Sequence, residues 1–319
     1  MREDVVALVD KAVAGGRLER IEVELFYALD DYSPEAYYLH WGAHEIAWQA
    51  ASGQAAIYAQ IGIDAQPCPG GCHYCSFARI NSSFEDAAVL PLDTVLAYCQ
   101  AFSDAGVHLV SLMTTAGFAF ADFLEIAREA RRLVGSDVAL MANIGDFDLA
   151  AAKQLRKAGI DIIYHAIRIG EGTITAISEE RRRATIQATY GAGLQFMSGV
   201  EPVYQGQDAA QVIDRMIEVA GWPLICSGIG PLRAVKGTRM AEAKCLSAPR
   251  YRLLSSLFRL MAGTHIPFGG ENTRWCNAGT NPRDTVMFPG AESIQTSVAA
   301  ARQDLQDHGW QVGRYRLCG

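Results

Sequence analysis

From residue 57 almost to its end, the chain alternates short apolar runs with longer amphipathic stretches. Amphipathic stretches of helical length occupy residues 92–106, 121–135, 148–159 and 208–221. The apolar runs have the length of buried strands and fall at residues 57–63, 108–114, 138–144, 160–167, 194–200, 223–229, 264–269 and 285–288. Strands that alternate with helices form a parallel sheet covered by helices, so the chain is predicted to be an α/β protein.

Eight strand-helix units are typical of a (β/α)8 barrel of the TIM type, and 319 residues suit such a barrel as one domain. A doubly wound open sheet is the alternative. The first 50 residues look helical, with Ser33 and Pro34 as an N-cap and first-turn pair. We therefore expect an N-terminal helical cap over residues 1–52 and a barrel with a C-terminal tail over residues 53–319.

Charge and hydropathy exclude several classes of function. The net charge of -7 and the isoelectric point near 5.5 argue against binding to nucleic acid, which requires clustered cations. The run Arg181, Arg182, Arg183 follows two glutamates, and we interpret it as a solvated helix face. The N-terminus has acidic residues where a signal peptide has basic ones, and no apolar stretch approaches bilayer length, so we expect a cytoplasmic protein without membrane contact.

Three of the eight cysteines, Cys68, Cys72 and Cys75, crowd into the segment CPGGCHYC. Such crowding in a chain of this length indicates a metal or redox site rather than a disulfide scaffold. Four thiolates would close a zinc site or fully ligate an iron-sulfur cluster, whereas three leave one iron open to react. The alternatives are a zinc site completed by a distant cysteine or by His73, and a redox pair of Cys72 and Cys75; no second Cys-x-x-Cys pair supports the former.

The cysteine segment directly follows the first expected strand. In a barrel, the loops after the strands gather at one mouth, where functional groups lie. We therefore expect the cysteines to share this mouth with polar residues from other strand ends. These residues are Thr114, Thr115, Asn143, Asp146, His165, Arg168, Glu201, Glu271 and Asn272.

The spacing Cys-x3-Cys-x2-Cys, with an aromatic Tyr74 before the last cysteine, resembles the radical S-adenosylmethionine (SAM) superfamily. The resemblance implies a 4Fe-4S cluster on Cys68, Cys72 and Cys75, with SAM bound at the fourth iron. It also implies that one-electron reduction cleaves SAM to methionine and a 5'-deoxyadenosyl radical, which takes hydrogen from an unactivated C-H bond. The protein would supply position and exclude water.

Beyond the cysteine loop, residues 157–167 and 233–241 resemble segments of the branch that contains biotin synthase. Biotin synthase holds a second, sulfur-donating cluster with cysteines on neighbouring strands. This chain has Met113, Met141 and Met197 near those places, so formation of biotin itself is not expected.

Three cysteines in the last third of the chain, the late cysteines, suggest a second cluster as a hypothesis. Cys226 falls in the sixth expected strand, Cys276 follows the seventh, and Cys318 lies in the C-terminal tail. Three thiols there could bind an auxiliary iron-sulfur cluster that supplies sulfur or relays electrons. The alternative is that each is a buried small hydrophobic residue, a common fate of free cysteine.

The resemblance also suggests which side chains contact SAM. Arg168 could pair with the methionine carboxylate and Glu171 with the ribose hydroxyls, since a guanidinium matches carboxylate geometry. Glu201 suits the SAM ammonium or a cationic substrate, against the alternative of a structural ion pair. The cofactor-binding residues predicted in this way are Tyr74, Thr115, Asn143, Arg168, Glu171 and Glu201.

The leading hypothesis is a radical SAM enzyme that inserts sulfur into a small substrate. The second is rearrangement or C-C fragmentation of an amino acid-like molecule, which gains if the late cysteines bind nothing. A non-catalytic protein that only carries a metal or cluster is the third hypothesis, and such a protein would not cleave SAM. The expected partners are flavodoxin or ferredoxin as electron donor and a second copy of the chain in a homodimer.

Overall fold

The computed structural model describes residues 1–81, 87–279 and 292–317. Its helices are α1 (Glu3–Val13), α2 (Arg20–Tyr27), α3 (Pro34–Ala50), α4 (Leu92–Ala105), α5 (Phe120–Leu133), α6 (Leu149–Lys157), α7 (Glu179–Gly191), α8 (Ala209–Ala220), α9 (Ala248–Ala262) and α10 (Ile294–Asp307). Its strands are β1 (Ala56–Gly62), β2 (Asp64–Ala65), β3 (Ala88–Val89), β4 (Leu109–Met113), β5 (Ala139–Asn143), β6 (Ile162–Tyr164), β7 (Gln195–Met197), β8 (Val200–Val203), β9 (Ile229–Pro231) and β10 (Thr273–Gly279). The helices predicted for residues 92–106, 121–135, 148–159 and 208–221 are confirmed as α4, α5, α6 and α8.

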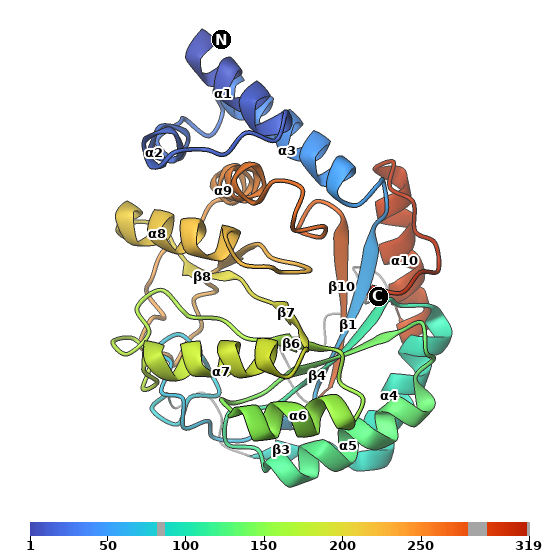
Figure 1. Ribbon diagram of the computed structural model, residues 1–319. Coiled ribbons are helices and arrows are strands. Elements are labelled where there is room, and N and C mark those ends of the chain that lie inside the picture. Colours follow the sequence, from blue (N-terminus) through green and yellow to red (C-terminus); the bar gives the residue numbers. More distant parts are fainter. Residues whose placement is uncertain (82–86, 280–291, 318–319) are drawn as a thin grey trace.

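The central sheet is parallel, with strand order β10-β1-β4-β5-β6-β7. Single parallel bridges from Met197 to Cys226 and from Cys226 to Phe268 extend it beyond β7. Only four residues separate Phe268 at one edge from Thr273 at the other, and so short a segment spans less than about 20 Å. The two edges therefore lie close together, and the sheet is curved as in the predicted (β/α) barrel (Figure 1).

One neighbour of β1 is β10, over residues 273–279, where no strand was predicted. The expected strand at residues 285–288 lies outside the described residues. The segment TRWCNAG is short of aliphatic side chains, so its apolar pattern is weak, but it pairs in register with all seven residues of β1. Pairing with a neighbouring strand compensates for this weak local preference.

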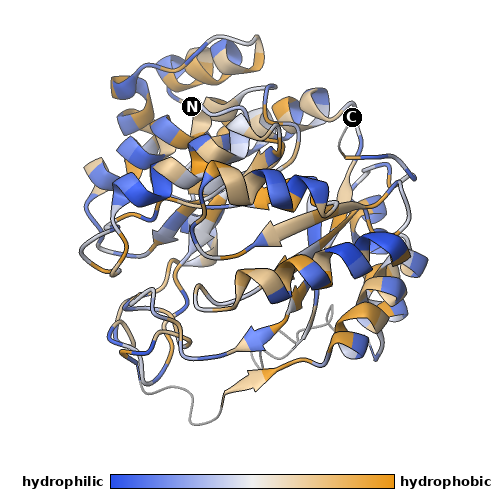
Figure 2. Ribbon diagram, turned by 60° about the horizontal axis from the view of Figure 1, so that its bottom comes forward, coloured by the Kyte–Doolittle hydropathy of each residue, from blue (hydrophilic) through white to orange (hydrophobic). Residues whose placement is uncertain are grey.

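Side chains alternate between the two faces of the barrel wall. On β1, Ile57, Ala59 and Ile61 point outward into a core shared with α4, α5, α6 and α10, whereas Tyr58 points into the barrel. Figure 2 shows hydrophobic residues along the central strands and mixed hydropathy on the surrounding helices. Burial on both faces explains why these strands read as continuous apolar runs.

The N-terminal helices stack on α9 at one side of the barrel (Figure 1). Ser33 accepts a hydrogen bond from Ala36 N at 3.1 Å, and Pro34 begins α3, so the predicted cap is confirmed. Val9 and Leu39 share one apolar core with Leu257 of α9. None of the helices in the described ranges is both long and apolar enough to span a membrane.

Candidate active site

The cysteine loop follows β1 and β2, at the carboxyl end of the barrel. Two backbone hydrogen bonds close its base, from Cys68 N to Phe77 O at 2.7 Å and from Arg79 N to Cys68 O at 2.9 Å. Gly71 has φ of +61°, a conformation that side chains rarely adopt, and an added Cβ would lie 2.7 Å from that of Ala176. The loop therefore turns back tightly against the segment after β6.

Asn81 braces the loop from within. Its side-chain amide donates to Cys72 O at 3.0 Å and to Cys75 O at 2.6 Å, and its carbonyl accepts from Arg239 N at 3.2 Å. Asn81 is buried, so these bonds are shielded from water. This side chain fixes the carbonyls beside two of the three thiols, a role that the sequence analysis did not foresee.

The cysteines line a cavity of about 300 Å³ at this mouth. Thr115, Asn143 and Arg168 line it as well, so the structure brings together three of the predicted cofactor-binding residues with the three thiols. Thr115 is held there by Asp64, whose carboxylate accepts from Thr115 N at 2.7 Å and from its hydroxyl at 2.6 Å. Asn143 is the last residue of β5.

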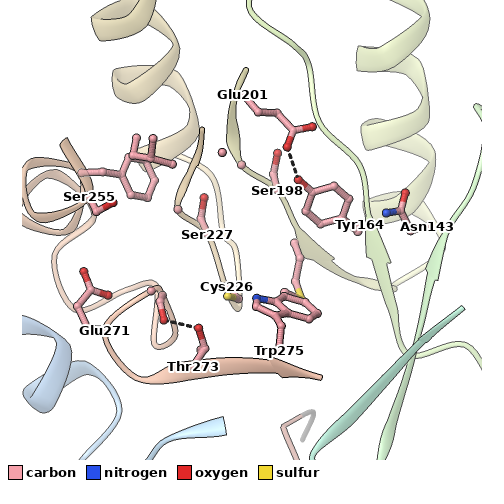
Figure 3. Close-up of a pocket in the computed structure, with 18 of the residues that line it drawn as sticks. Asn143, Tyr164, Ser198, Glu201, Cys226, Ser227, Ser255, Glu271, Thr273 and Trp275 are labelled. Carbon is pink, nitrogen blue, oxygen red and sulfur yellow. Dashed lines mark hydrogen bonds between the residues drawn. The ribbon is translucent and has the colours of Figure 1, made fainter. Parts of the chain in front are cut away.

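Arg168 and Glu201 face each other across the mouth. Arg168 Nε lies 3.8 Å from Glu201 Oε1, and the Tyr164 hydroxyl donates to Glu201 Oε2 at 2.9 Å (Figure 3). Arg168 Nη1 is buried without a hydrogen-bond partner among the described residues, although it lies 3.8 Å from Glu171 Oε2. A buried guanidinium N-H normally has an acceptor, so this atom points to an anionic ligand.

Two of the predicted cofactor-binding residues lie outside the lining of both cavities. Glu171 lines neither this cavity nor the larger one beside it, and its side chain is fully buried. Its oxygens accept from Arg168 N at 2.9 Å and from the Thr175 hydroxyl at 2.7 Å, so it braces the Arg168 loop instead of facing a ribose. Tyr74 also lines neither cavity, and its buried hydroxyl has no partner among the described residues.

A buried ionic network lies next to the Arg168 loop. Asp146 Oδ1 lies 3.0 Å from His165 Nε2 and 3.2 Å from Arg182 Nη1, and Arg182 Nε lies 3.3 Å from Glu171. Burial would raise the pKa of Asp146, but the hydrogen bond from His165 and the charge of Arg182 outweigh it and hold the pKa at about 2. Arg182 is 5% exposed, so the predicted solvated face is wrong at this residue.

Comparisons with known proteins identify the family. Residues 65–193, which include the cysteine loop and the segment after β6, match the Radical SAM superfamily. These residues form a radical SAM domain. The chain is 23% identical to the biotin synthase of Geobacter metallireducens over 276 residues, which cover 83% of this chain and 82% of that protein. It is also 23% identical to the biotin synthase of Syntrophotalea carbinolica, over 85% of this chain and 84% of that one.

Solved structures share the fold at low sequence identity. Methylornithine synthase has a TM-score of 0.75 and 14% identity, over 96% of this chain and 97% of that chain. The FeFe-hydrogenase maturase HydG from Carboxydothermus hydrogenoformans has a TM-score of 0.76 and 16% identity, over 98% of this chain and 80% of that chain. These structures confirm the predicted α/β barrel fold, and the two biotin synthases agree with the predicted biotin synthase-like branch.

The donor set fits an iron-sulfur cluster. A Cβ added at Gly70 would lie 3.4 Å from Cys68 Sγ and 3.8 Å from Cys72 Sγ, so glycine keeps the space beside the thiols open. Burial raises the pKa of the Cys72 thiol to about 11, and the nearby Arg168 opposes that rise. Thiolates in such a dry site need cationic partners, and iron together with Arg168 would supply them.

A larger cavity of about 630 Å³ lies beside the first. The two share Gln60, Met113, Asn143 and Arg168, so these four residues mark the boundary between them. Glu201 and Tyr164 also line the larger cavity, together with Met141, Met197 and Trp275. Its volume suits a small organic substrate.

The structure separates the late cysteines. Cys226 lines the larger cavity within the barrel, whereas Cys276 points outward from β10 into the core beside Ser297 of α10. Alternation along β10 causes this, because Trp275 takes the inward position. Cys276 therefore does not face the cavity that Cys226 lines. Cys318 lies outside the described residues.

Proposed function

We propose that this radical SAM enzyme starts a rearrangement or fragmentation of a small substrate held in the larger cavity. When bound, the 4Fe-4S cluster on Cys68, Cys72 and Cys75 supplies the electron that cleaves SAM to methionine and a 5'-deoxyadenosyl radical. The supporting observation is that the thiol-lined cavity and the larger cavity share a boundary of four residues. A radical made in one would meet a substrate in the other without crossing water.

The side chains at the boundary have separate roles in this proposal. Arg168 offers its unpartnered Nη1 to the carboxylate of SAM, and Asn143 offers its amide to the same ligand. Glu201 accepts from the SAM ammonium, with the Tyr164 hydroxyl holding the carboxylate in place. Met113 and Met141 line the passage with apolar surface that excludes water.

Rearrangement or fragmentation takes precedence over sulfur insertion. Sulfur insertion needs a donor, and the hypothesis rested on a second cluster on Cys226, Cys276 and Cys318. Cys226 and Cys276 lie on opposite faces of the barrel wall, which favours the reaction class that needs no auxiliary cluster.

The experiment is anaerobic reconstitution with iron and sulfide, followed by reduction with dithionite in the presence of SAM. We expect about four irons per chain and formation of 5'-deoxyadenosine. A variant with Cys68, Cys72 and Cys75 all changed to Ala should bind no iron and form no 5'-deoxyadenosine. Iron retained by that variant would support an auxiliary cluster and return sulfur insertion to first place. A parent protein that binds iron without cleaving SAM would leave only the carrier hypothesis.

Three further assignments complete the proposal. Residues 1–52 are a helical cap, and residues 53–319 are the barrel with its C-terminal tail. The electron donor is flavodoxin or ferredoxin, and the enzyme works in the cytoplasm as a homodimer. Reduction by flavodoxin in place of dithionite tests the donor, and light scattering tests the oligomeric state.

A further inference from the structure

The part of the larger cavity around Ser227, α9 and Glu271 has a charge pattern of its own. Arg259 and Ser255 of α9 line this part of the cavity together with Glu271, which lies between Phe268 and β10. Figure 3 shows Ser255, Ser227 and Glu271 around the same space. Arg168 belongs to the boundary with the thiol-lined cavity, and it and the nearby Glu201 are separate from this group. We call Arg259, Glu271, Ser227 and Ser255 the polar pocket.

The polar pocket contains buried polar atoms without partners. Arg259 Nε, Ser227 Oγ and Ser255 Oγ have no hydrogen-bond partner among the described residues. Arg259 is 3% exposed and Ser227 is 6% exposed. Buried polar atoms are satisfied in most proteins, because an unmade hydrogen bond costs free energy. Because the three residues line one cavity, these atoms point to a ligand with several polar atoms.

The charges of the polar pocket are one cation and one anion. Arg259 Nη2 lies 3.3 Å from Glu271 Oε2, and its Nη1 donates to Ile266 O at 2.6 Å, so the guanidinium is fixed and Nε remains available. Gly269 lies directly against this pair, because an added Cβ would lie 2.7 Å from Glu271 Oε2. Glycine therefore lets the ion pair approach the strand end that carries Ser227.

We propose that the polar pocket binds the zwitterionic head of an α-amino acid substrate. Arg259 Nε and the two serine hydroxyls donate to the carboxylate, and Glu271 accepts from the ammonium group. A guanidinium and a carboxylate side by side match a ligand that carries both charges on one carbon, whereas a dicarboxylate or a diamine would meet repulsion from one of them. This inference rests on the proposed function, for which it names the substrate class.

The apolar wall fixes the direction of the substrate. Met141, Met197 and Trp275 line the cavity along with the polar pocket and belong to the apolar interior of the barrel. An amino acid held by its head in the polar pocket would extend its side chain along this wall toward the boundary with the thiol-lined cavity. The hydrogen atom removed would therefore come from the side chain, and it would form a new C-H bond at the 5' carbon of the adenosyl group.

The test uses the full chain with its reconstituted cluster and SAM, and a mixture of the twenty fully deuterated proteinogenic α-amino acids as the probe. Equilibrium dialysis measures binding, and mass spectrometry measures deuterium in 5'-deoxyadenosine. We expect one amino acid to bind and to transfer deuterium. Formation of 5'-deoxyadenosine with no amino acid bound or labelled would overturn the inference and leave the proposed function standing. Binding without any cleavage of SAM would support the inference and count against the proposed function.

Variants distinguish recognition of the amino acid's zwitterionic head by these residues from a purely structural role. Glu271→Gln keeps the shape but removes the charge, so binding of the identified amino acid should weaken at least about tenfold, while binding of its deaminated analogue should stay the same. Ser227→Ala should weaken both ligands, because its hydroxyl faces the carboxylate they share. Glu125→Gln, at an exposed position on α5, is the matched control and should change neither. Equal weakening of both ligands by Glu271→Gln would refute the assignment of the ammonium site.

Discussion

The change of Asp146 to Asn tests the ionic network beside the thiol-lined cavity. The Asp146 side chain is 5% exposed and contacts His165 and Arg182, and Arg182 connects it to Glu171 and so to the Arg168 loop. Asparagine has nearly the same shape but no charge. The variant therefore leaves Arg182 buried with one anion fewer, and the loss of stability should exceed that of a surface change.

The pKa of Asp146 gives the magnitude. It is about 2 in the folded protein and 3.8 ordinarily, and at about 1.4 kcal/mol per pKa unit the charged form stabilises the fold by roughly 2 kcal/mol at pH 7. Because the folded pKa is the lower one, this contribution is present above about pH 4 and is lost as the pH falls toward 2. At pH 3 roughly half of it should remain.

His165 also makes the free energy of unfolding fall as the pH decreases. Burial lowers its pKa below the ordinary 6.5, so the folded state binds this proton less readily than the unfolded state does. Stability should therefore also decline as the pH falls below about 6.5 in the parent protein. Asp146 opposes the lowering of the His165 pKa, so Asp146→Asn should lower that pKa further, and the difference between the two proteins reports the Asp146–His165 pair.

Urea unfolding of the parent and of Asp146→Asn, at pH 7 and at pH 3, is the assay. Asp122→Asn serves as the matched control, because Asp122 is exposed on α5. We expect Asp146→Asn to lower the free energy of unfolding at pH 7 by roughly 2 kcal/mol and the control by less than about 0.5 kcal/mol. Equal effects of the two changes at pH 7, or a deficit of the same size at both pH values, would refute the electrostatic reasoning.

Three other changes test the cysteine loop and the late cysteines. Asn81→Ala removes two hydrogen bonds to loop carbonyls, so it should cost about 2 kcal/mol in urea unfolding and lower the iron bound on reconstitution; unchanged iron would contradict its bracing role. Gly71→Ala should lose iron as well, since its Cβ would meet Ala176, whereas Gly15→Ala, at φ of +87° in open space, should cost stability without losing iron. Cys276→Ala should bind as much iron as the parent, and less iron would mean that Cys276 ligates a cluster after all.

Much of the fold follows from local sequence pattern. Continuous apolar runs specify strands buried on both faces, and capping pairs such as Ser33 with Pro34 specify where helices begin. The pattern failed at β10, where Thr273, Arg274 and Asn277 interrupt the apolar residues. Its pairing with β1 depends on the curvature of the whole sheet. A short segment of sequence contains no information about that curvature.

The candidate site could be predicted where functional residues have a recognisable spacing along the chain. The Cys68 loop and the strand-end residues Asn143, Arg168 and Glu201 were identified because parallel strands bring their carboxyl ends to one mouth. Asn81 and Asp64 were missed, since an isolated Asn or Asp has no spacing that marks it as a brace. Arg182 was misread because a run of arginines on a helix is ordinarily solvated.

The sequence alone determined the barrel class and the cysteine loop, because each depends on residue types at fixed separations along the chain; the radical SAM family entered through the resemblance of that loop. Only the tertiary structure decided which side of the wall each residue faces. In the structure Cys276 points outward from the barrel, whereas Cys226 lines the larger cavity. Glu171 lies outside the cavity lining, and Arg259 of α9 lies beside Glu271. The physical reason is that facing depends on pairing register and on the packing of distant elements, and a shift of one residue in a strand reverses it.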